Sequence, residues 1–177
     1  GSTDNFATDS KVKGCIDLIP SGNTTGILDV TSVLDTHNRI VCLLSQGMST
    51  YSKMTLQIVD TDGKLATPAD GVDIYKTEKY SFFQNSMIRA VLMDNDRMFV
   101  TFISMPEQKY PVLYKAYVDF KDTIVMSTPE ELVEFDRNFT SGGDIECYDA
   151  DESAKRIRHI WYETNSKNIF GYSVDVK

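Results

Sequence analysis

Short apolar runs alternate with polar turns along most of the chain, in a spacing that is typical of β-strands. In the middle of the chain, residues 87–93, 97–104 and 112–119 form three such runs. The run at 97–104 is almost continuously apolar, which predicts a strand covered on both faces. A fourth run, residues 124–135, is interrupted near Pro129, because proline cannot donate a backbone hydrogen bond to a sheet. We therefore predict a unit of four antiparallel strands.

The first part of the chain follows the same plan. Its predicted strands are residues 27–34, 39–45, 54–60 and 65–75. The Asp-Gly pair at residues 62–63 is a typical hairpin turn between the last two. The last part of the chain ends directly after the third run of its unit, at Lys177. Helical periodicity is weak throughout, so we expect an all-β fold.

The three parts also resemble one another in sequence. Each contains an apolar pair, a polar turn, an arginine and a further apolar run. The arginines are Arg39, Arg97 and Arg156, roughly 60 residues apart, and self-similarity at a fixed period indicates a repeat architecture. We place the repeats near residues 25–80, 81–140 and 141–177.

Four-stranded antiparallel units that repeat in sequence resemble the blades of a β-propeller. The resemblance covers residues 25–177 and indicates an architecture but no particular family, since the paired glycines of kelch blades and the Gly-His and Trp-Asp pairs of WD40 blades are missing. It implies about three blades. Propellers typically have four to eight, so the blades would belong to a larger propeller or would complete a ring by oligomerisation. A β-sandwich or a β-barrel is the alternative fold.

The length of 177 residues suits one domain, which we place at residues 11–177. Residues 1–10 are expected to form a tail, and its first residues, Gly1 and Ser2, resemble the scar of a cleaved expression tag. Residues 11–19 are a candidate for the strand that completes the last repeat.

Composition and charge narrow the possible partners. The chain is 41% hydrophobic and 25% charged, as in ordinary soluble domains, and its formal net charge is −8. Nucleic acid requires a basic surface, so we predict no nucleic-acid partner. No apolar run approaches the roughly 18 to 20 residues of a spanning helix, so we predict no membrane insertion. The sequence leaves the compartment open.

The motifs of common catalytic and metal sites are missing. The three cysteines, Cys15, Cys42 and Cys147, lack the spacing of metal ligands. No Gly-x-Ser-x-Gly motif and no glycine-rich phosphate loop is present, and the two histidines are His37 and His159. We predict no catalytic residue, no metal and no cofactor.

One polar pair occupies an unusual position. Arg158 and His159 lie in a predicted strand at positions where the other two units carry hydrophobic residues. Because burial of charge without a partner is unfavourable, either this strand has one exposed face or Arg158 contacts a carboxylate or an anionic ligand. We keep both residues as candidate binding residues.

Aromatic residues are concentrated in the loops that we expect at one end of the sheets. Loops carry recognition more often than frameworks do, and aromatic side chains are favoured anchors at interfaces. The candidate binding residues in these loops are Tyr51, Tyr80, Phe82, Phe83, Tyr110 and Phe139. The alternative for Phe82 and Phe83 is that they begin the next unit and belong to the core.

These patterns favour a non-enzymatic protein-interaction or structural assembly module, a domain of a larger protein that binds a protein partner or assembles with itself. A carbohydrate-binding or carbohydrate-cleaving propeller, with a glycan as ligand, is one alternative. A β-barrel that binds a small ligand is the other. Function depends on sites rather than on folds, so the choice requires the arrangement of the side chains.

Overall fold

The computed structural model describes residues 16–20, 26–47, 50–77, 86–94, 96–104, 110–135, 145–151, 153–163 and 168–176. These residues form twelve β-strands and no helix, which confirms the all-β prediction. Within this described part, no helix is long and apolar enough to cross a membrane.

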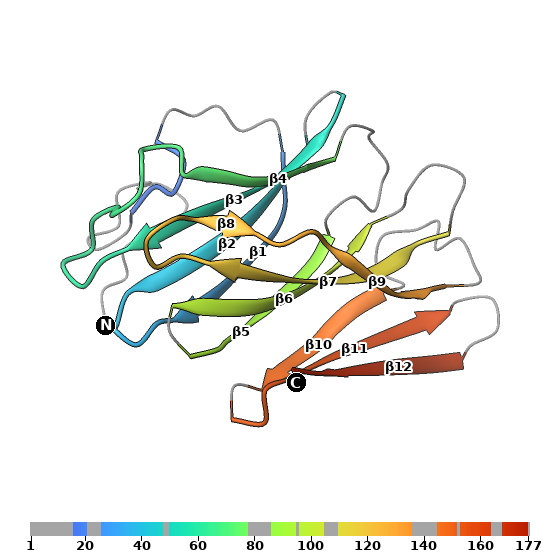
Figure 1. Ribbon diagram of the computed structural model, residues 1–177. Helices are drawn as coiled ribbons and strands as arrows, with labels where there is room; N and C mark the ends of the chain where they lie inside the picture. The colour runs from blue at the N-terminus through green and yellow to red at the C-terminus, as the bar shows by residue number, and fades with distance from the viewer. Residues whose placement is uncertain are drawn as a thin grey trace, which may run out of the picture.

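The strands form three antiparallel sheets (Figure 1). The first sheet has the strand order β1 (Ile27–Leu34), β2 (Ile40–Gly47), β3 (Ser52–Val59) and β4 (Val72–Thr77). In the second sheet, β5 (Ser86–Leu92), β6 (Arg97–Ser104) and β7 (Val112–Asp119) are followed by β8 (Val125–Met126) and β9 (Glu130–Glu134), which both pair with β7. The third sheet contains β10 (Ile145–Asp151), β11 (Arg156–Glu163) and β12 (Asn168–Asp175).

Most strands lie close to where the apolar runs predict them. The strand predicted at residues 65–75 is the exception, because β4 begins only at Val72 and Leu65 forms an isolated bridge with Val59. Each sheet falls within one of the three predicted repeat units. The predicted strand at 124–135 is divided into β8 and β9, and Pro129 lies between these two pieces. Local turn chemistry therefore positions most of the strands, whereas the stacking of the sheets depends on their side chains.

The second sheet lies between the other two. Every residue of β6 after Arg97 is buried, because both faces of this strand are covered. Met98, Val100 and Phe102 belong to the cluster shared with the first sheet. Phe99 and Ile103, which alternate with them, belong to the cluster shared with the third sheet. The prediction that this strand is covered on both faces is confirmed.

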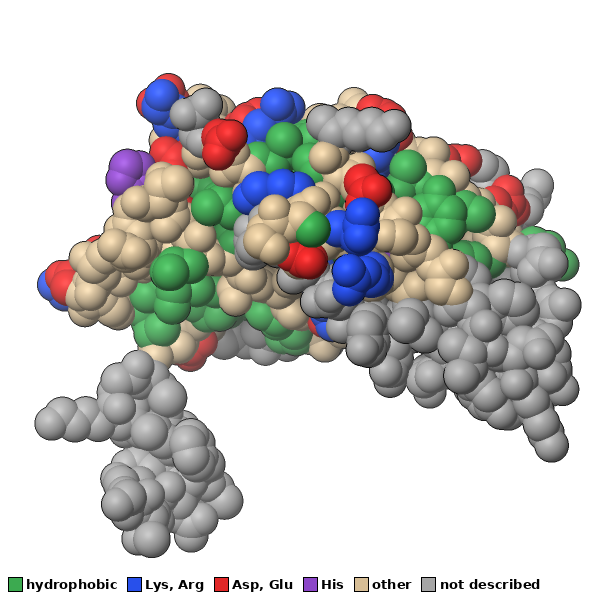
Figure 2. Space-filling view, turned by 90° about the horizontal axis from the view of Figure 1, so that it is seen from below, with side chains coloured by type: hydrophobic (Ala, Val, Ile, Leu, Met, Phe, Trp, Pro, Cys, Tyr) green, Lys and Arg blue, Asp and Glu red, His purple; other side chains and the backbone are tan. Residues whose placement is uncertain are grey.

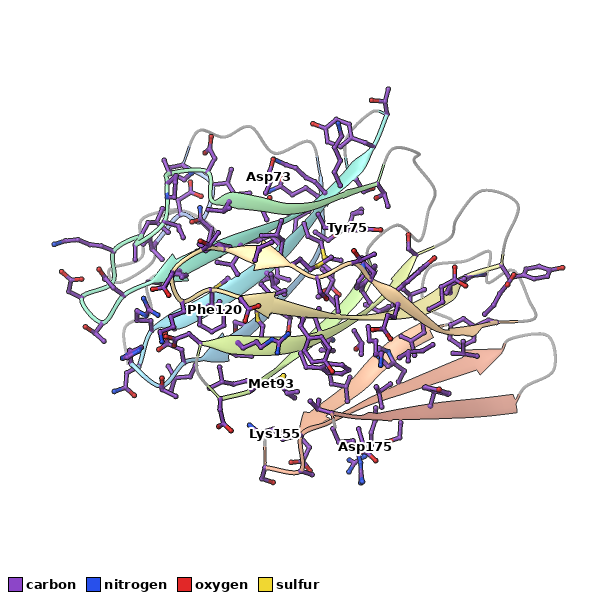
Figure 3. All side chains as sticks on the ribbon, viewed as in Figure 1. Asp73, Tyr75, Met93, Phe120, Lys155 and Asp175 are labelled. Carbon is purple, nitrogen blue, oxygen red and sulfur yellow. The ribbon has the colours of Figure 1, made fainter. Side chains whose placement is uncertain are left out.

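The larger cluster lies between the first and second sheets (Figure 3). Phe102 is fully buried there and contacts two aromatic rings. Its ring centroid lies 5.4 Å from that of Tyr114, in a stacked arrangement, and 5.7 Å from that of Tyr75 on β4. The first sheet contributes Val33, Val41, Leu43, Met54, Leu56 and Ile58. The smaller cluster on the other face joins Phe99, Leu113 and Phe135 to Ile157 and Val174 of the third sheet.

Polar contacts join neighbouring sheets near their first strands. Asp29 on β1 accepts a hydrogen bond at 2.7 Å from the backbone N–H of Ile88 on β5. The Arg89 guanidinium lies 3.5 Å from the same carboxylate. On the other side, the ammonium group of Lys155 donates to the backbone oxygen of Leu92 at the end of β5. Thus β5 is held from both sides.

The turns between the first two strands of each sheet share one backbone feature. The residue directly before the arginine has a positive φ in all three: 60° at Asn38, 56° at Asp96 and 50° at Lys155. Non-glycine residues adopt this left-handed conformation uncommonly. The same turn geometry therefore recurs in the three sheets.

The arginines after these turns each pair with a carboxylate. Arg97 lies 3.3 Å from Asp119 on the adjacent strand, and Arg156 pairs in the same way with Asp175. In the first sheet, the Arg39 Nε donates instead to Asp35 at 2.7 Å. Burial alone would raise the pKa of Asp35, but hydrogen bonds from Arg39 and from the backbone N–H of His37 lower it below its ordinary value.

The described residues before β1 pack on the first sheet. Ile19 is buried with Cys42 and Leu44 on the face of that sheet opposite to the second sheet, and Leu18 packs beside them. The Gln57 side-chain amide donates to the backbone oxygen of Leu18 at 2.6 Å. Residues 16–20 form no strand, so this part of the candidate segment 11–19 does not pair with the third sheet. Residues 11–15 lie outside the described residues.

We expect Phe102→Ala to lower the free energy of unfolding by about 3–5 kcal/mol, because truncation of a fully buried aromatic side chain leaves a cavity. Urea unfolding followed by circular dichroism measures this loss. Val125→Ala is the control: Val125 is half exposed, so its truncation should change stability by about 0.5 kcal/mol or less. Equal losses in the two variants would contradict the packing described for Phe102.

Candidate functional site

Two of the predicted loop aromatics lie in the described part of the chain. Tyr51 precedes β3 and is half-buried, with the Lys76 ammonium 4.2 Å from its ring centroid. Tyr110 precedes β7 and is 47% exposed, and its backbone N–H donates to Glu134 at 3.2 Å. The two contact different sheets. Tyr80, Phe82, Phe83 and Phe139 lie outside the described residues.

Arg158 and His159 lie on opposite faces of β11. His159 is fully buried and faces the second sheet, where its Nε2 lies 2.9 Å from Oγ1 of Thr101 on β6. Arg158 is half-buried on the other face. Its positive charge contributes to a lowered pKa of Asp151, which results chiefly from the hydrogen bond that Ala154 N–H donates to this carboxylate. In this arrangement His159 is inaccessible to an external partner, whereas Arg158 lies near a carboxylate, that of Asp151.

The environment of His159 keeps its ring neutral. Burial, and then the positive charge of Arg89, lowers its pKa to about 4. Among the described residues, Nδ1 of this ring has no hydrogen-bond partner. The contact with Thr101 is thus a neutral hydrogen bond between two sheets.

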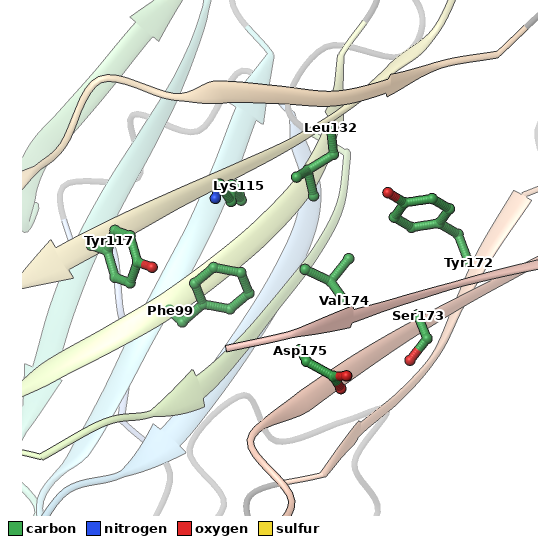
Figure 4. Close-up of a pocket in the computed structure, with 8 residues that line it drawn as sticks. All are labelled: Phe99, Lys115, Tyr117, Leu132, Tyr172, Ser173, Val174 and Asp175. Carbon is green, nitrogen blue, oxygen red and sulfur yellow. The ribbon is translucent and has the colours of Figure 1, made fainter. Parts of the chain in front are cut away.

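A cleft of about 390 Å³ opens between the second and third sheets (Figure 4). Such a volume lies at the small end of ligand-binding clefts. The second sheet contributes one wall, from β6, β7 and β9, and β12 contributes the other. The lining residues are Phe99, Lys115, Tyr117, Leu132, Tyr172, Ser173, Val174 and Asp175.

The charged groups of this cleft already have partners. The Lys115 ammonium lies 3.2 Å from Glu130, and Asp175 pairs with Arg156. Tyr117 packs edge-on against Phe99, with 5.4 Å between the ring centroids. Five of the six uncharged lining residues are aromatic or aliphatic, although polar atoms form the larger part of the accessible surface of the cleft.

These features do not support hydrolysis of a glycan. Hydrolysis by the usual mechanism requires two carboxyl groups about 5 to 10 Å apart. Of the eight lining residues, Asp175 is the one carboxylate, and it is ion-paired. Within the part of the chain that the structure describes, no group of three or more His, Cys, Asp or Glu side chains is placed to hold a metal ion.

A second unusual surface lies on the first sheet, on the face opposite to the second sheet. The residues of β1 that alternate outward include Val30 and Leu34, which are 43% and 60% exposed. Leu34 pairs with Ile40 on β2, which is also exposed. Ile27 and Leu28 extend the row past an irregularity in the pairing of β1. We call these five residues the β1 apolar row. On the side of the molecule seen in Figure 2, hydrophobic patches alternate with charged side chains.

The sequence contained a signal for the β1 apolar row, because Leu28, Val30 and Leu34 fall at alternate positions that mark one face of a strand, interrupted only by Ser32. Periodicity does not show whether that face is covered. The cleft had no such signal, since its walls come from distant parts of the chain that only the stacking of the sheets brings together.

A scan of the chain against protein-family models found no match, and a search of curated proteins found none either. The functional conclusion therefore depends on the geometry of these surfaces.

The buried histidine predicts a specific dependence of stability on pH. The pKa of His159 lies below the ordinary 6.5, so the unfolded chain takes up the proton first as the pH falls. The contribution of neutral His159 to the free energy of unfolding is fully present above pH about 6.5. As the pH falls from about 6.5 to about 4, this contribution is lost and the free energy of unfolding decreases by about 3 kcal/mol.

Urea unfolding across this pH range measures the effect, by comparison of the wild type with His159→Gln. The variant should lose less stability than the wild type as the pH falls, since carboxylates titrate alike in both. Val125→Ala is the control and should retain the wild-type slope, because it changes an exposed side chain that carries no titratable group. A wild-type slope in His159→Gln would contradict the burial of a neutral ring.

Proposed function

We propose that the chain is a non-enzymatic protein-interaction and assembly module, built from three propeller-type blades. The observation that carries this proposal is the β1 apolar row, a line of aliphatic side chains that remains exposed on a sheet whose opposite face packs against the second sheet. Large exposed apolar patches on folded proteins commonly mark interaction surfaces.

Three features support the blade interpretation. Each sheet is an antiparallel meander, and the sheets stack face to face. The first strands of successive sheets are neighbours, since β5 contacts both β1 and β10. The positive φ before Arg39, Arg97 and Arg156 recurs at the same place in each sheet. Radially arranged blades would bring their first strands together in this way.

The β1 apolar row is suited to bind another apolar surface. Complete burial of a leucine, isoleucine or valine side chain contributes about 1.5–3 kcal/mol. The row carries no charged side chain, because Asp29 points to the second sheet, where it bonds to Ile88. The charged residues Lys53 and Asp73 lie on the same face of the sheet but on β3 and β4, away from the row, and they form an ion pair with each other.

The partner that we propose is a second copy, bound through the same face. The outer face of the third sheet, the other end of the stack, carries Arg156 and Arg158. Packing of this face on the apolar row would bury charged groups, which is unfavourable without new partners. Contact between like faces instead produces a twofold-symmetric dimer, the commonest closed assembly.

The loop aromatics are a second proposed contact, for a protein partner other than a copy of the chain. Tyr110 is the better placed of the two described residues, since its side chain is about half exposed. Its backbone is fixed by the hydrogen bond to Glu134, so little conformational freedom would be lost on binding.

Leu34→Lys combined with Ile40→Lys should convert a dimer into a monomer, because two charges would be buried in the contact. Light scattering coupled to size exclusion, over a wide range of concentrations, measures the mass. Val125→Lys is the matched control: Val125 is similarly exposed but lies on β8, so this variant should remain dimeric. A wild-type chain that is monomeric at every concentration would overturn the proposed self-assembly.

A further inference from the structure

The two interfaces of the second sheet differ at their outer ends. Between the first and second sheets, the outermost strands β4 and β8 are in contact. Tyr75 of β4 reaches Phe102, and Ile124 and Met126 pack into the same cluster. This interface is therefore closed by a fourth strand on each side.

The interface between the second and third sheets has a fourth strand on one side only. There β9 covers the outer part of the second sheet, but β12 is the last strand of the third sheet among the residues that the structure describes. The cleft lies beside β12, between Lys115, Tyr117 and Leu132 of the second sheet and the side chains of β12 (Figure 4). It occupies the place that a fourth strand of the third sheet would fill.

The outer edge of β12 presents backbone groups to this place. The backbone N–H of Val176 donates to the oxygen of Lys155 at 2.8 Å. Hydrogen-bonded pairs alternate along an antiparallel ladder, so Val174 and Tyr172 also bond to β11. The N–H and C=O groups of the intervening Ser173 and Gly171 point away from β11, towards the open edge.

We propose that this edge and cleft bind an extended polypeptide strand from a protein partner. The strand pairs antiparallel with β12 and inserts apolar side chains, at every second position, between Tyr172 and the wall formed by Tyr117 and Leu132. Main-chain hydrogen bonds give such complexes their affinity, and alternate side-chain pockets give specificity. The inference depends on the proposed function, because it specifies how a protein-interaction module binds one class of partner.

The chemistry of the cleft favours a peptide over a small charged ligand. Both charged lining residues, Lys115 and Asp175, are already in ion pairs. The remaining side chains of the cleft are mainly apolar or aromatic. An extended strand with apolar residues can form backbone hydrogen bonds with the edge of β12 and pack its side chains against the walls of the cleft.

The pairing rule also predicts which amides of the bound strand are used. Ser173 is exposed on the outer face of the third sheet, whereas the neighbouring Val174 is buried against the second sheet. Residues in a hydrogen-bonded pair carry their side chains on the same face. The residue that bonds to Ser173 therefore has its side chain outward, and the inserted apolar residues lie between such positions.

The probe is a labelled peptide of alternating valine and threonine with a lysine at each end, and fluorescence anisotropy measures its binding. We expect saturable binding to the full chain with a Kd below about 1 mM. Ser173→Pro removes one N–H that points away from β11, and proline is tolerated on edge strands. This variant should bind at least about tenfold more weakly, whereas the matched control Ser173→Ala should bind like the wild type.

Two modified peptides test the same pairing without any change in the protein. Methylation of the threonine amides should abolish binding, because the outward residues bond to β12. Methylation of the valine amides should leave binding intact. No saturable binding of the unmodified peptide, or equal binding of the two methylated forms, would overturn the proposal.

The experiment separates this inference from the proposed self-assembly. Leu34→Lys with Ile40→Lys should bind the peptide like the wild type, and Ser173→Pro should retain the mass of the wild type. Loss of peptide binding with self-assembly intact would reject the strand site alone. Peptide binding by a strictly monomeric chain would support the strand site and reject self-assembly.

Discussion

The burial of the second sheet on both faces is the constraint on which the rest of the molecule depends. Phe99 and Phe102 lie on opposite faces of one strand, so the first and third sheets are both required to cover it. Each outer sheet meets this requirement with one apolar face. The remaining face of each outer sheet does not contact the second sheet, so the chemistry of these two faces can differ.

The two ends of the stack do differ. The first sheet exposes aliphatic side chains on its outer face, whereas the third sheet places arginine side chains there. Their outer edge strands are alike in one respect, because each carries a paired carboxylate. Asp73 of β4 pairs with Lys53 of the adjacent strand. Asp175 of β12 pairs in the same way with Arg156, and β12 also presents the small residues Gly171 and Ser173 at its edge.

The strands could largely be predicted from the sequence, because the information that defines them is local. The nearly continuous apolar run at 97–104 indicated a strand with both faces covered, and Pro129 marked the division between β8 and β9. The site could not be predicted in the same way. His159 is polar and lies in a strand, which allowed an exposed position, but its partner Thr101 is separated from it by 58 residues. Only the stacking of the sheets makes that contact.

The contact between His159 and Thr101 also has a consequence for how the third sheet is aligned. Hydrophobic surfaces attract one another in many relative positions, so apolar packing alone permits a sheet to slide along its neighbour. A shift of β11 by two residues along β6 would move the imidazole from Thr101 to Phe99 or Ile103, neither of which can accept or donate a hydrogen bond through its side chain. A buried polar ring without any partner is costly. This single polar pair therefore disfavours shifted alignments and favours the position in which the imidazole meets Thr101 while the apolar side chains of the interface remain packed.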